Sequence, residues 1–131
     1  MKADLGLLVL RLTAGFFMAN HGWSKAVRLA SGDTKFADPL GIGQLPSLIL
    51  VIFAELLCSV AVAAGLWTRV AAIPVVIAMA VAGFVQLAHS PLEEKELALV
   101  YCAIFLAIAL MGGGRYSLET AWTKLRRSKG K

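Results

Sequence analysis

The stretch Leu5–Ala26, "LGLLVLRLTAGFFMANHGWSKA", decides the fold because it is long, apolar and broken by only a few charged or ionisable residues. A helix needs about 20 mainly apolar residues to cross the roughly 30 Å hydrocarbon core, with its backbone groups satisfied inside the segment. Residues 5–23 meet this requirement. Arg11 nevertheless lies near the start of the stretch, and His21 and Lys25 lie near its end. The pattern predicts a membrane span that carries a polar site.

The composition of the whole chain also indicates a membrane protein. Of its 131 residues, 59% are hydrophobic, and the mean hydropathy of +0.76 exceeds that of an ordinary soluble domain. Charged residues gather between apolar runs and at the C-terminus and do not form a nucleic-acid-binding groove. We therefore interpret the formal charge of +5 as a signal for the orientation of the chain in the membrane. Cys58 and Cys102 stand singly in apolar runs, where we expect them to pack as small apolar side chains. The N-terminal run resembles a signal peptide, but Arg11 interrupts it and no small-residue cleavage site follows, so we expect the segment to be retained.

Four apolar segments predict a single all-α domain over residues 1–131, an integral membrane four-helix bundle. The expected spans are 5–23, 46–67, 70–88 and 96–111. The short connections "LWTRV" and "HSPLEEKE" predict tight antiparallel turns. The stretch Lys25–Leu45 is too long for such a turn, and it predicts either a cap over one mouth of the bundle or a solvated loop.

An even number of spans places both termini on one side of the membrane. Most of the basic residues then fall on that side, namely Lys2, Arg69, Arg115, Lys124, Arg126, Arg127, Lys129 and Lys131. The positive-inside rule therefore predicts that both termini are cytoplasmic. We expect the basic tail 115–131 to lie against anionic lipid headgroups.

Glu55 is the charge that the lipid tolerates least. It lies about 14 Å into a span that starts at Pro46, at the helical rise of roughly 1.5 Å per residue. An isolated charge at that depth costs at least about 2.5–3.5 kcal/mol, so Glu55 should face the bundle interior and have a partner. We expect a structural ion pair between Arg11 and Glu55. In the alternative, Arg11 reaches the cytoplasmic surface and Glu55 is protonated.

The predicted topology brings further polar residues to the outer mouth of the bundle, above Glu55. His21 ends the first span, His89 ends the third, Glu96 opens the fourth, and Lys25 is close to His21 in sequence. Such groups bind a carbonyl or an anion, or pass protons between carboxylate and imidazole. The alternative is a set of interfacial residues solvated by water and headgroups. The candidate ligand-binding residues are Arg11, His21, Lys25, Glu55, His89 and Glu96.

Metal and haem sites have little support in the sequence. Two histidines on different helices could hold either group, but no i, i+3 or i, i+4 ligand pair and no C-x-x-C-H motif occurs. We therefore expect no metal, and we assign no catalytic residue.

The chain resembles the DoxX family of small four-helix bacterial membrane proteins. The resemblance rests on "LLVLRLTAGFFMANHGWSK", "AELLCSVAVAAGLWTRVAAI" and "GGGRYSLE", with Glu119 where the family more often has Asp. It implies a four-helix bundle in the bacterial inner membrane. It also implies a polar site whose members here are Arg11, His21, Lys25 and Glu55, with Arg69, His89 and Glu96 as weaker members. Relatives include the DoxD-type small subunit of thiosulfate:quinone oxidoreductase, and other members are linked to membrane redox and to sulfur or oxidative-stress systems.

These observations favour a redox-associated membrane subunit that binds a small polar-headed molecule such as a quinone. A non-catalytic assembly or anchoring subunit is the first alternative, and a small transporter is the second. Neither the residues nor the resemblance predict a particular reaction. The expected partners are the lipid bilayer and either a redox protein or further copies of the chain.

Overall fold

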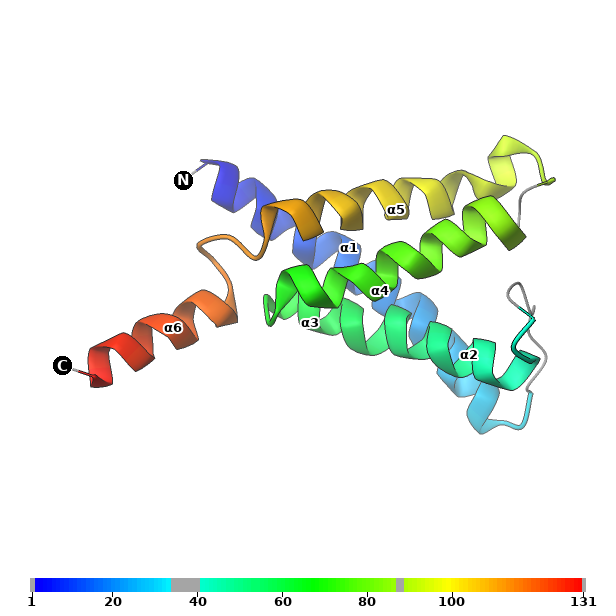
Figure 1. Ribbon diagram of the computed structural model, residues 1–131, viewed down its shortest axis with the longest axis horizontal. Coiled ribbons are helices and arrows are strands. Elements are labelled where there is room, and N and C mark those ends of the chain that lie inside the picture. Colours follow the sequence, from blue (N-terminus) through cyan, green and yellow to red (C-terminus); the bar gives the residue numbers. More distant parts are fainter. Residues whose placement is uncertain (1, 34–40, 87–88, 131) are drawn as a thin grey trace.

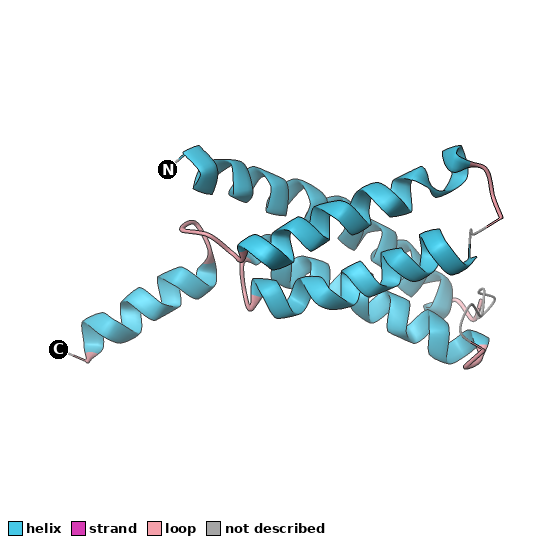
Figure 2. Ribbon diagram, turned by 45° about the horizontal axis from the view of Figure 1, so that its top comes forward, coloured by secondary structure: helices cyan, strands magenta, loops and turns pink. Residues whose placement is uncertain are grey.

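The computed structural model describes residues 2–33, 41–86 and 89–130, and all the regular structure in these ranges is helical (Figures 1 and 2). The elements are α1 Lys2–Ala30, α2 Gln44–Ile52, η1 Phe53–Cys58, α3 Ser59–Ala64, α4 Thr68–Val81, η2 Ala82–Gln86, α5 Leu92–Met111 and α6 Leu118–Lys129, where η denotes a π-helical segment. Four rods form the bundle: α1, the continuous α2–η1–α3, the continuous α4–η2, and α5. The prediction of an all-α membrane bundle is confirmed.

Three of these rods have the length and hydropathy of a membrane span. They cover Lys2–Ala30, Gln44–Ala64 and Thr68–Val85. The first turns of α5 carry charged residues, which leaves 97–111 as its apolar part. Because α5 packs along α4 as an antiparallel hairpin, we retain it as a proposed fourth span (Figure 1).

The helix boundaries differ from the predicted ones in one way that matters for the site. The first helix does not end near residue 23 but continues to Ala30, so Lys25 lies on α1 and not in a connecting loop. Residues 25–30 of the predicted cap, Lys25–Leu45, therefore belong to α1. Residues 34–40 of the cap lie outside the described ranges. At the other end of the molecule, α1 begins at the same end of the bundle as α6. Helix α6 itself projects away from the bundle (Figure 1).

Close contact between main chains fixes α1 against η1 and α3. A Cβ atom on Gly15 would lie 2.7 Å from the Cβ of Ala63, and one on Gly22 would lie 2.6 Å from the backbone nitrogen of Leu56. Small residues at such positions allow membrane helices to approach closely, because any larger side chain would hold them apart. This contact brings the last turns of α1 directly beside Glu55.

The core forms where the four rods meet. Its largest fully buried apolar side chains are Met18, Leu48, Val62, Val75, Phe105 and Ile108. Large apolar side chains also cover the outer faces of the rods, among them Phe16, Leu57 and Leu110. A soluble bundle would bury such residues, whereas a helix in lipid can leave them on its surface.

Candidate functional site

Glu55 lies in η1, the π-helical part of the second rod. Its side chain is 4% exposed. Just beyond it, the hydroxyl of the fully buried Ser59 donates to the carbonyl oxygen of Ala54 at 3.4 Å and satisfies a backbone group within the irregular turn. π-Helical turns are rare and occur frequently at functional sites. The local irregularity therefore coincides with Glu55, the most deeply buried acid among the described residues.

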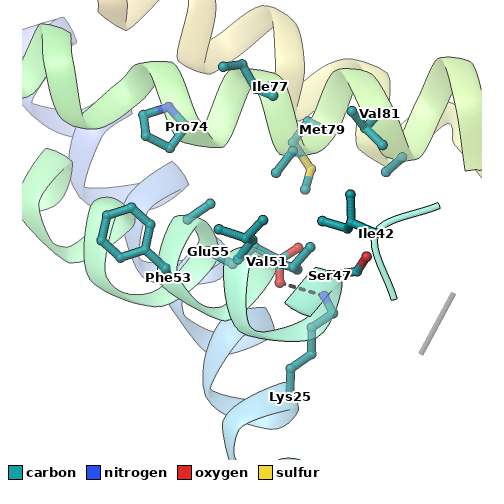
Figure 3. Close-up of a pocket in the computed structure, with 14 residues that line it drawn as sticks. Lys25, Ile42, Ser47, Val51, Phe53, Glu55, Pro74, Ile77, Met79 and Val81 are labelled. Carbon is teal, nitrogen blue, oxygen red and sulfur yellow. Dashed lines mark hydrogen bonds and ion pairs between the residues drawn. The ribbon is translucent and has the colours of Figure 1, made fainter. Parts of the chain in front are cut away.

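The partner of Glu55 is Lys25. The Lys25 Nζ donates to Glu55 Oε2 at 2.5 Å, and the side chain of Lys25 is 22% exposed (Figure 3). The two residues meet because Gly22, one turn before Lys25, brings α1 against the main chain of η1. A carboxylate and an ammonium group at this separation neutralise each other in surroundings where an isolated charge would be costly.

The expected ion pair between Arg11 and Glu55 does not form between these two described residues. Lys25 follows Arg11 by 14 residues on α1 (25 − 11), which is about 21 Å at the helical rise. The contact at Gly22 aligns Glu55 with the far end of α1, where Lys25 lies, and not with the end that carries Arg11. The depth of Glu55 was a sound reason to expect a cationic partner, but depth alone does not say which cation reaches it.

Arg11 is completely buried near the opposite end of the bundle. Its guanidinium donates to the carbonyl oxygens of Val62 and Ala63, at 3.4 and 3.5 Å, and to that of Tyr116. The first two carbonyls belong to the last turn of α3, where helical carbonyls lack intrahelical partners and the helix dipole is negative. Arg11 therefore caps α3 and ties it to the segment that precedes α6.

Gly65 and the segment before α6 pack closely against one side of the Arg11 guanidinium. A Cβ atom on Gly65 would collide with Arg11 Nη1, and Gly65 adopts a left-handed conformation with φ of 82°. The backbone N–H of Glu119 donates to the Gly65 carbonyl at 3.1 Å, and that of Arg115 donates to Asp4 Oδ1 at 3.2 Å. The "GGGRYSLE" stretch thus wraps this end of the bundle.

A cavity of about 400 Å³ lies beside the Lys25–Glu55 pair, between the second and third rods (Figure 3). Its remaining walls are almost entirely apolar and come from α2, η1, α4 and η2, with Ile42 closing one side. The exposed side chains of Leu50, Phe53 and Ile77 belong to its lining, so the cavity opens on the outer surface of the bundle. This volume and composition are typical of a site for a small molecule.

The cavity combines an apolar enclosure with a few polar atoms. Lys25, Glu55 and Ser47 are its polar side chains among the described residues. An ammonium group has three donors, and the contact with Glu55 uses one, so Lys25 keeps donors for a ligand. Glu55 is an acceptor when ionised and a donor when protonated. The arrangement suits a molecule with a carbonyl head and an apolar body.

The other predicted site residues do not line this cavity. His21, His89 and Glu96 are exposed in the structure. The His21 ring instead lies edge-on to Tyr101, with 6.1 Å between ring centroids. Arg69 lies at the opposite end, beside Gly112. Of the predicted ligand-binding set, only Lys25 and Glu55 are brought together.

The apolar part of the cavity has no signal in the sequence. Pro74, Met79 and Val81 read as ordinary residues of a membrane span, and nothing marks them as facing a space. The π-helical turns have no recognisable motif either. The acid at mid-span is the one feature of the sequence that points to this region, since Glu55 lies in the wall of the cavity.

A comparison with known families agrees with this architecture. The DoxX family model matches residues 6–88, which include all but the first residues of α1, the second rod and the third rod.

The chain belongs to the DoxX family.

The matched range contains Arg11, Lys25 and Glu55, and it ends before α5. No curated protein and no solved structure matches the chain. Within the described residues, no group of three or more His, Cys, Asp or Glu side chains lies close enough to hold a metal ion.

Proposed function

We propose that this DoxX protein is a redox-associated membrane subunit whose cavity binds the head of a quinone. The observation that carries the proposal is the Lys25–Glu55 pair in the wall of an apolar cavity that opens on the outer surface of the bundle. A buried ion pair without a ligand-sized space would fit a purely structural role. An apolar cavity without the pair would accept any acyl chain.

The chemistry of a quinone matches both parts of this cavity. Its carbonyl oxygens accept hydrogen bonds, and the donors of Lys25 that Glu55 does not use are available for one of them. Its ring and tail are apolar and fit the walls formed by residues such as Val51 and Met79. A quinone is dissolved in the membrane, so an opening between the second and third rods gives it a direct path from the lipid.

Glu55 supplies the proton chemistry in this proposal. Reduction of a quinone to a quinol takes two electrons and two protons, and a carboxyl group beside a carbonyl oxygen can donate one of those protons. The electrons come from a redox partner protein. Glu55 takes up one proton from solvent at the outer mouth and passes it to the carbonyl oxygen, and the second proton also comes from solvent.

Quantitative lipid extraction tests the proposal. The full chain is purified in a mild detergent from wild-type and variant cells, and the co-purifying quinone is measured by mass spectrometry per mole of protein. We expect Glu55→Gln to lower the quinone content at least tenfold, because Gln has neither the negative charge that fixes the ammonium of Lys25 nor a carboxyl proton to donate.

Glu96→Gln is the matched control, because it makes the same change at an exposed residue outside the cavity. It should leave the quinone content unchanged. Equal quinone content in all three proteins would contradict the proposal. A stoichiometric protein partner without any quinone would favour the assembly subunit instead.

A further inference from the structure

The second polar region of the molecule, around Arg11, contains a buried charge that has no carboxylate partner among the described residues. Arg11 is completely buried, and its guanidinium has carbonyl oxygens but no carboxylate within ion-pair distance among the described residues. Its Nε has no hydrogen-bond partner there at all. Carbonyl dipoles satisfy donors, but they leave the net charge of the group in place. The positive charge of Arg11 therefore attracts an anion that lies beside it.

A surface hollow of about 550 Å³ lies next to Arg11, between α1, the end of α3 and the first turns of α6. Arg11 forms part of its floor, and the exposed Arg115 and Lys124 belong to its lining. No acidic residue is among the described residues that line it. Three positively charged residues thus line one hollow, at the end of the bundle where α1 begins and from which α6 projects (Figure 1).

The hollow also offers neutral hydrogen-bonding groups and apolar surface. The hydroxyls of Ser117 and Thr120 line it and bond to each other at 2.9 Å. Leu8 and Leu12 of α1 form its apolar side, on a helix whose outer face meets the lipid. A ligand of this hollow should therefore be an anion with an acyl chain attached.

We propose that this hollow binds the phosphate of an anionic phospholipid headgroup. Arg115 and Lys124 contact the phosphate oxygens, and the fixed charge of Arg11 beneath them adds to the attraction. The acyl chains run along Leu8 and Leu12 of α1. The site is distinct from the Lys25–Glu55 cavity and does not depend on the function proposed for it.

Native mass spectrometry of the full chain in a neutral detergent tests the assignment. Phosphatidylglycerol and phosphatidylcholine with the same acyl chains are added separately, and inorganic phosphate is added alone in a third series. We expect one phosphatidylglycerol to remain bound, at least tenfold more tightly than phosphatidylcholine. Tight binding of inorganic phosphate without preference for phosphatidylglycerol would overturn the lipid assignment.

Paired substitutions on α6 and the segment before it separate the hollow from general surface charge. Arg115→Gln with Lys124→Gln removes two charges that line the hollow, whereas Arg126→Gln with Arg127→Gln removes two charges of the same tail outside it. The first pair should weaken phosphatidylglycerol binding at least tenfold, and the second by less than threefold. An equal loss in both would overturn the proposal. All four residues are exposed, so circular dichroism should show the same helical content in both variants.

Discussion

Arg11 and Lys25 are cations on the same helix, yet their surroundings differ in kind. The partners of Arg11 are main-chain carbonyls from the end of α3 and from the segment before α6, and Gly65 packs directly against its guanidinium. The partner of Lys25 is the side chain of Glu55, and a cavity lies beside both. A main-chain carbonyl cannot change its charge or turn away, whereas a carboxylate can do both. The comparison indicates that a cation in a membrane span can tie backbone segments together, as Arg11 does, or can pair with an acidic side chain beside a cavity, as Lys25 does.

The largest expected effect is that of Arg11→Ala. Three carbonyl groups would lose a charged donor and a fully buried side chain would be replaced by a space, so unfolding should become easier by about 3 kcal/mol or more. Thermal unfolding in detergent, followed by circular dichroism, measures the change. Arg126→Ala on the exposed face of α6 is the control and should stay within about 0.5 kcal/mol of the wild type. If both variants behaved alike, Arg11 would not be the structural tie that its contacts indicate.

Gly65→Ala should have the next largest effect, about 2 kcal/mol. Its φ of 82° is strained for any residue with a Cβ, and that Cβ would displace both Arg11 and Ser117. The same change at Gly6 meets no atom within 4 Å inside α1, so it should stabilise the helix by about 0.5–1 kcal/mol. Chemical unfolding of the two variants gives the comparison. A Gly65→Ala protein as stable as Gly6→Ala would show that this end can relax around a larger side chain.

The sequence predicted the fold well, and it pointed to some residues of the candidate site but not to their partners, for reasons that these residues make clear. Hydropathy and length locate the helices, since a bilayer imposes both, although the end of the first apolar run near residue 23 did not reveal that α1 continues to Ala30. The depth of Glu55 predicted a buried ion pair. Its partner depends on the contact of Gly22 with η1, which is a property of two helices together and leaves no pattern in either one.

Replacing the ion pair as a unit should have a small effect on stability and a large one on binding. Glu55→Leu alone leaves Lys25 without its partner and should destabilise the protein, whereas Lys25→Met with Glu55→Leu should return it to within about 1 kcal/mol of the wild type. A double-mutant cycle measures this, from the unfolding free energies of Lys25→Met, Glu55→Leu and the double variant. The double variant should be stable but contain no quinone. A stable double variant that retained quinone would separate the pair from ligand binding.

The smallest effect is expected for His21→Ala. His21 is exposed and lines no part of the Lys25–Glu55 cavity, so the quinone content should change by less than twofold. Its contact with Tyr101 is a single edge-on ring contact, and its loss should cost no more than about 1 kcal/mol. The same lipid extraction and unfolding measurements apply. A tenfold loss of quinone in His21→Ala would extend the site to the outer mouth of the bundle.

Photo-crosslinking most directly distinguishes the two regions. The full chain in membranes is treated with an azidoquinone, irradiated and digested, and the labelled peptides are identified by mass spectrometry. The label should fall on residues 47–55 and 74–82, which border the Lys25–Glu55 cavity, and excess unmodified quinone should remove it. Label concentrated on the segments around Arg11, or spread evenly over the lipid-facing side chains and unaffected by competition, would contradict the assignment of the cavity as the quinone site.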